Sequence, residues 1–213
     1  MATSGEMVAK VADLFEVHEA TIESIDRVLS EAGMRTKGGR GRSAAIMSGA
    51  DVVNLSIAVI LGVGMKDAPG AVAKIIRMQR QNATLQWRPD PQKPLTLLDE
   101  QVGQYKLHPA TAENLTEFPV AAALLDAKNI GEGLAALVNG MVAGEFEGAG
   151  DMMLNVQMTS IGPSATIFYA TRAGILRVHY QTTGPEAERP VFERRFKLDE
   201  ALIQRLAGVI RPA

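Results

Sequence analysis

The residues best suited to chemistry in this chain are basic side chains around a glycine-rich stretch, TKGGRGRS at residues 36–43. Arginine and lysine pair with phosphate, and glycine lets a backbone come close to a nucleic acid. A second basic group follows further along the chain. The cationic candidates are Arg35, Lys37, Arg40 and Arg42 in the first group and Lys74, Arg77 and Arg80 in the second. We expect both groups to contact a nucleic-acid backbone; the alternatives are a flexible, solvated connection and a solvated basic face.

The distribution of charge along the chain supports a local contact with a polyanion. The whole chain of 213 residues has a formal net charge of −2. Residues 35–93 nevertheless hold ten Lys or Arg and three Asp, a net charge of +7, whereas residues 1–34 carry −5 and residues 94–213 carry −4. A basic segment between acidic flanks indicates one local binding surface rather than a basic protein as a whole.

Composition excludes several classes of protein. With 46% hydrophobic and 22% charged residues, the chain can bury a core, so disorder and a collagen-like structure are excluded. The longest apolar run, residues 55–65, falls short of the ~20 residues that a membrane helix needs. The first residues lack the pattern of a secretion signal, and there is no Cys for a disulfide or a thiolate metal site. We therefore expect a cytoplasmic protein without a membrane contact.

The hydrophobic periodicity predicts an α+β protein whose first half is helical. Apolar residues at helical spacing predict helices that begin near Thr3, span residues 20–32, follow Ser48 through residue 61, and span residues 70–81. Three prolines in residues 82–96 disfavour a helix there. The predicted domains are residues 1–82, a Pro-rich linker at 83–97, and residues 98–213.

The second half of the chain changes from a helical to an alternating pattern. Helical patterns near residues 112–127 and 131–143 precede three alternating segments, centred on residues 154–158, 167–169 and 176–180, and a possible fourth at 191–197. Gly-containing turns between them favour an antiparallel meander of three to four strands. A last helix over Asp199–Ile210 is expected to cover one face of this sheet. This half would oligomerise or receive a signal.

Residues 8–27 resemble a helix-turn-helix. The pattern needs a small residue where the two helices cross, which is Ala12, and apolar residues that bury the second helix, which are Val17, Ile22 and Ile25. The turn position that is usually Gly is Glu16, so the turn is either strained or differently shaped. The basic stretch that follows is similar to the loop of winged members of this class, and its residues 39–42, Gly-Arg-Gly-Arg, are similar to the core of an AT-hook.

The resemblance implies how DNA would be read. The outward positions of the second helix would face the major groove, and they are His18, Glu19, Ala20, Thr21, Glu23, Ser24 and Arg27. Arg27 would pair with guanine, Glu23 would accept from a cytosine amine, and Thr21 or Ser24 would bond to phosphate or base edges. Because three acids, Glu19, Glu23 and Asp26, crowd this helix, we expect the basic loop to contribute more to binding than the helix does. The alternative is a helical hairpin used only for packing or dimerisation.

No other motif indicates an activity. The three His residues share no ligand spacing, no pair of acids is placed for general acid/base catalysis, and the GEGLAA stretch at residues 131–136 lacks the buried strand that a dinucleotide site needs. We therefore predict no enzyme, no metal and no cofactor.

The sequence thus predicts a cytoplasmic, non-enzymatic protein that binds double-stranded DNA with some specificity and regulates transcription. A homo-oligomer, with a dimer favoured, would engage two half-sites. The alternative is a bacteriophage-type assembly or DNA-packaging adaptor in which the helix-turn-helix mainly oligomerises, and a ring of many subunits would favour it. An effector, if one exists, cannot be named from the sequence.

Overall fold

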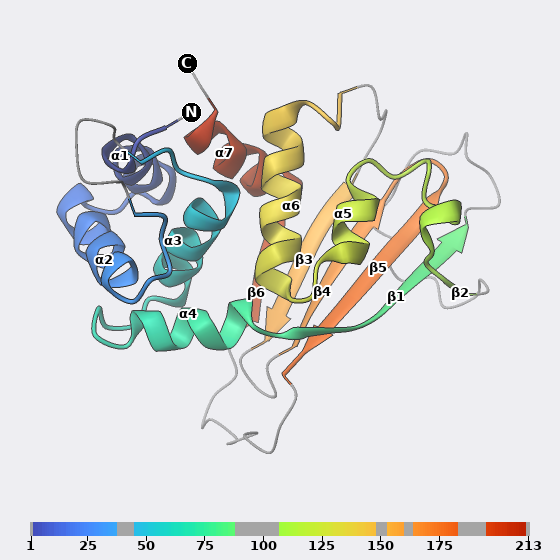
Figure 1. Cartoon of the computed structure of the whole chain (residues 1–213), viewed down its shortest axis with the longest axis horizontal. Coiled ribbons are helices and arrows are strands. Elements are labelled where there is room, and N and C mark those ends of the chain that lie inside the picture. Colours follow the sequence, from blue (N-terminus) through green and yellow to red (C-terminus); the bar gives the residue numbers. More distant parts are fainter. Residues whose placement is uncertain are drawn as a thin grey trace.

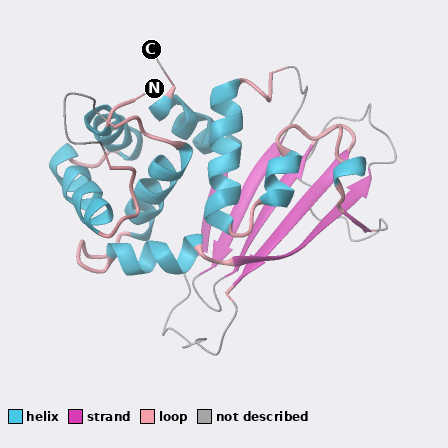
Figure 2. Ribbon diagram, in the orientation of Figure 1, coloured by secondary structure: helices cyan, strands magenta, loops and turns pink. Residues whose placement is uncertain are grey.

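The computed structural model describes residues 2–37, 45–87, 107–147, 153–159, 164–182 and 195–211. It is an α+β protein (Figures 1 and 2). The α-helices are α1 (Ser4–Phe15), α2 (Glu19–Glu31), α3 (Gly49–Leu61), α4 (Ala68–Ile76), α5 (Ala121–Asp126), α6 (Ile130–Ala143) and α7 (Glu200–Ile210). The strands are β1 (Gln79–Trp87), β2 (His108–Pro109), β3 (Met153–Thr159), β4 (Ser164–Ala170), β5 (Gly174–Gln181) and β6 (Arg195–Asp199).

The strands form one antiparallel sheet in the order β2-β1-β5-β4-β3-β6. The predicted meander is confirmed, because β3, β4 and β5 pair consecutively and β6 adds on the outer side of β3. Alternation places Ile167 and Tyr169 of β4 and Val178 and Tyr180 of β5 on the buried face, which α5 and α6 cover. The sheet is larger than predicted, because β1 and β2 join it beside β5.

The prediction for residues 70–87 was wrong in part. The helix expected over residues 70–81 ends at Ile76, and residues 79–87 form β1, so residues 83–87 belong to a strand rather than to a linker. Ala83 and Leu85 alternate with polar residues, and Leu85 is fully buried against the sheet. Residues 79–87 form a strand because they pair with β5, which is eight residues long. The rest of the predicted linker, residues 88–97, lies outside the described residues.

Two helix predictions in the second half also need correction. Residues 112–127 form a short 3-10 turn and the six-residue α5 rather than one helix, whereas α6 agrees with its predicted range to within a residue. The last helix, α7, was expected to cover a sheet face. It packs mainly against α1, α3 and α6, and only its beginning lies against β3 and β6.

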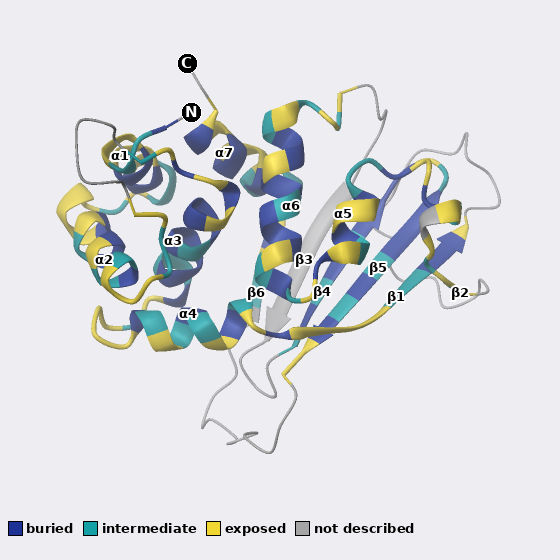
Figure 3. Cartoon of the chain, in the orientation of Figure 1, coloured by how far each residue is buried: buried dark blue, intermediate teal, exposed yellow. Residues whose placement is uncertain are grey.

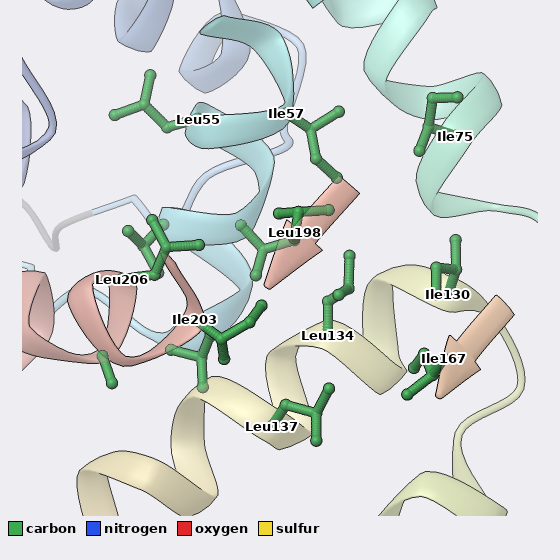
Figure 4. Close-up of a cluster of buried hydrophobic side chains, with 14 of the residues drawn as sticks. Leu55, Ile57, Ile75, Ile130, Leu134, Leu137, Ile167, Leu198, Ile203 and Leu206 are labelled. Atoms are coloured by element: carbon green, nitrogen blue, oxygen red, sulfur yellow. The ribbon is translucent and has the colours of Figure 1, made fainter. Parts of the chain in front are cut away.

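One hydrophobic core runs through both halves of the chain. Leu55 and Ile57 of α3 lie with Leu198 of β6, Ile203 of α7 and Leu134 of α6 in a continuous cluster of buried side chains (Figure 4). The burial map shows the same pattern, because the inward faces of α3, α6 and α7 are all buried (Figure 3). The N-terminal helices are therefore packed onto the helices that cover the sheet.

We expect a fragment of residues 1–82 to lose most of its stability when it is cut from the rest. Ile57, which points toward Leu198 in Figure 4, would become exposed to water, and burying one such side chain contributes about 1.5–3 kcal/mol. The measurement is chemical denaturation followed by circular dichroism, with the full chain as the control. A fragment that unfolds cooperatively at the denaturant midpoint of the full chain would contradict this expectation.

Candidate nucleic-acid interface

Helices α1 and α2 form a hairpin with the packing that the sequence predicts. Thr3 closes a capping box with Glu6 at the start of α1. At the crossing, Ala12 is buried, and Ile22 and Ile25 of α2 are buried as well. Burial of these three side chains fits a helical hairpin of either predicted kind, whereas Val17 packs against the core only partly buried. The axes are held close because a small side chain stands at the contact.

The turn between these helices adopts the conformation that Glu disfavours. Glu16 has φ 53° and ψ 40°, in the left-handed region, and its amide caps the end of α1. A non-glycine residue pays about 1–2 kcal/mol for this conformation. The first of the two predicted alternatives, a strained turn, therefore describes this hairpin.

Replacing Glu16 by Gly should raise the free energy of unfolding by about 0.5–1 kcal/mol. Glycine adopts the left-handed region without strain, although part of that gain is lost to the greater entropy of its unfolded state. The measurement is the denaturant midpoint of the full chain. The control is Glu16→Ala, which removes the carboxylate but keeps the strain. Equal midpoints for the Gly and Ala variants would show that the backbone is not the cause.

The outward face of α2 is exposed but carries more acid than base. His18, Thr21, Glu23 and Arg27 are exposed, as predicted for a helix that could enter a groove. Ser24 is half-buried, and its hydroxyl donates to the carbonyl of Ala20 at 2.8 Å, inside its own helix. With Glu19 and Glu31 also exposed, the helix repels phosphate more than it attracts it.

Arg35 is paired inside the protein. Its Nε lies 2.9 Å from Oδ1 of Asp26, and its side chain is only 17% exposed. The N–H bond is not aimed at that oxygen, so the contact is an ion pair rather than a hydrogen bond. The guanidinium also donates to the carbonyl of Thr36 at 3.1 Å. Arg35 was a candidate for backbone contact, but it is occupied in fastening the chain after α2 to α2 itself, and we leave it out of the interface.

A single carboxylate binds the chain on both sides of the basic segment, by which we mean residues 37–45. Asp51, in the first turn of α3, is 4% exposed. Before the segment, Thr36 donates its amide to Oδ1 at 2.7 Å and its hydroxyl to Oδ2 at 2.9 Å. After it, Ser48 donates its amide at 2.7 Å and its hydroxyl at 2.8 Å, both to Oδ2. We call these contacts the Asp51 clamp.

The other predicted cations differ in where they lie. Lys37 is exposed and directly follows the clamp, while Arg40 and Arg42 lie outside the described residues. Lys74 and Arg77 are exposed at the end of α4. Arg80 lies on β1, and its guanidinium donates to the carbonyl of Leu125 at the end of α5. The helical strip of Lys74, Arg77 and Arg80 is therefore not formed, because the helix ends before Arg80.

The clamp and the ion pair are features that the sequence reading missed. Asp26 was counted among the acids that face DNA, but it is buried, and Ser4 donates its hydroxyl to it at 3.2 Å. Burial raises the pKa of the Asp26 carboxyl, and the positive charge of Arg35 offsets part of that rise. For the clamp a sequence signal did exist, because Ser48 and Asp51 have the spacing of a capping box.

The buried carboxyl of Asp26 should make stability fall as pH rises. Its pKa is higher in the folded state, so between the ordinary and the raised value the folded chain binds more protons than the unfolded chain. This contribution to the free energy of unfolding is present in full below the ordinary pKa of an Asp carboxyl, and it is lost above the raised pKa of Asp26. We expect Asp26→Asn to remove this part of the slope, measured by denaturation between about pH 3 and 7.

Arg35→Met is the matched control for that experiment. Because Arg35 lowers the pKa of Asp26, its removal should extend the falling part of the stability curve to higher pH. An unchanged slope in Asp26→Asn would mean that another group is responsible.

Comparison of the chain with known proteins identifies no relative. No protein-family model, curated protein or solved structure gives a significant match to the chain. Among the described helices, none combines the length and the apolar character that crossing a bilayer requires. Within the same residues, no cluster of three or more His, Asp or Glu is arranged to hold a metal ion.

Proposed function

We propose that this chain binds double-stranded DNA through its N-terminal helices, in the manner of a winged helix-turn-helix, and regulates transcription. The basic segment between Lys37 and Ala45 supplies the main backbone contacts, and α2 supplies a weaker contact in the major groove. The observation that carries the proposal is the Asp51 clamp, because it fastens both ends of the most basic, glycine-rich stretch of the chain to one helix.

Two contacts near the segment support a main contribution to binding from the segment and a weaker one from α2. The ion pair of Arg35 with Asp26 ties the chain just before the segment to α2. Fixing the residues on either side of a segment lowers the conformational entropy that binding costs. Arg27, exposed on α2, is the cation best placed to read a base, and burial of Asp26 removes one of the acids that would oppose it.

The acidic face of α2 favours a second candidate function. Glu19, Glu23 and Glu31 are exposed there with one cation, Arg27, which suits contact with a basic protein surface better than with phosphate. In that case the chain is an assembly or DNA-packaging adaptor. Its mass in solution separates the two proposals, since a dimer fits the regulator and a ring of many subunits fits the adaptor.

Removing Arg40 and Arg42 together should weaken DNA binding about equally for all sequences. Each phosphate contact releases counterions, so the double Ala variant should reduce the slope of log affinity against log salt by about 1 to 2. Arg27→Ala should instead relax the preference at one position of the binding site. The measurement is fluorescence anisotropy with specific and random duplexes at several salt concentrations.

The matched control is Arg205→Ala, which removes an exposed cation from α7. It should leave the salt slope unchanged. A double variant at Arg40 and Arg42 with the wild-type slope would show that the basic segment does not contact the DNA backbone.

A further inference from the structure

Helix α6 reaches the first turn of α3, where the Asp51 clamp is formed. The amide of Gly49, the first residue of α3, donates to Oδ1 of Asn139 on α6 at 3.1 Å. The first amides of a helix have no partner within the helix and need an outside acceptor. Ser48 and Asp51 cap the start of α3 locally, and Asn139 caps it from a residue 90 positions away.

The two helices are in close contact at this point. A Cβ atom on Gly49 would lie 2.5 Å from Oδ1 of Asn139 and 2.9 Å from the carbonyl oxygen of Ala135, so only glycine fits against α6 here. On its other side α6 is equally close to the sheet, because a Cβ atom on Gly133 would lie 2.7 Å from the hydroxyl of Tyr180. Helix α6 is therefore fixed between the sheet and the start of α3.

We propose that Asn139 is a positioning residue for the Asp51 clamp. It holds the first turn of α3, this turn holds the Asp51 clamp, and the clamp holds Thr36 and Ser48 at the two ends of the segment. Helix α6 thereby links the clamp to the sheet. The consequence for DNA rests on the function proposed above, whereas the effect on the clamp does not.

Asn139→Ala tests the inference in the full chain. Because Asn139 is exposed, the variant should fold. Loss of one hydrogen bond should make amide exchange at Thr36, Ser48 and Gly49 about two- to tenfold faster, as followed by residue-resolved NMR. DNA affinity should fall by a similar factor with an unchanged salt slope, because no phosphate contact is removed. Asn139→Asp keeps an acceptor oxygen and should restore both.

Two controls separate positioning from general destabilisation. Exchange at Val178, within β5, should stay the same, because it reports opening of the sheet. Asn82→Ala, which removes an exposed Asn from β1, should change neither exchange at the clamp nor affinity. Gly49→Ala should reproduce the faster exchange at Thr36, because the added methyl group pushes α3 from α6.

The outcomes are distinct for the two proposals. Unchanged exchange at Thr36 and Ser48 in Asn139→Ala overturns the positioning role, whatever the DNA result. Faster exchange with unchanged affinity overturns its consequence for binding. If the wild-type chain binds no DNA duplex, the proposed function fails, and the exchange measurement still decides whether Asn139 holds the clamp.

Discussion

The arrangement of the N-terminal helices depends on one buried carboxylate. Asp51 accepts four hydrogen bonds, two from Thr36 and two from Ser48, and these replace the water that an isolated charge would need. Its place in the first turn of α3 adds the favourable field of a helix N-terminus. Because the donors come from both sides of a basic segment, the same carboxylate caps the start of α3 and joins Thr36 to Ser48.

The helical unit that bears this clamp is part of a larger packed body. Lys10 of α1 donates to the carbonyls of Gly208 and Val209 at 3.4 and 3.2 Å, and so caps the last turn of α7 from the other end of the chain. A cation at a helix C-terminus is favourable because that end carries partial negative charge. With the shared hydrophobic core, this contact makes the ends of the sequence stabilise each other.

Charge divides into an internal set, which shapes the fold, and an external set, which is free to bind. Asp26, Asp51 and Arg35 are paired with other groups inside the protein, and burial raises the pKa of Asp26. Helix α2 has an exposed, acidic face, and the sequence that follows Lys37 is basic. In the function proposed above, the basic segment would contact the DNA backbone, and α2 would contribute discrimination more than affinity.

The sequence by itself determined the local structure. Periodicity and caps placed α1, α2, α3 and α6, and alternation placed the meander. These are interactions between neighbours in the chain, which a pattern can record. Only the tertiary structure decided that residues 79–87 are a strand, that Arg35 and Asp26 face inward, and that α7 packs beside α1. Each of these outcomes depends on a partner in another part of the fold, such as β5 for β1 or α2 for Arg35, and the free energy of a contact exists only once the fold brings both sides together.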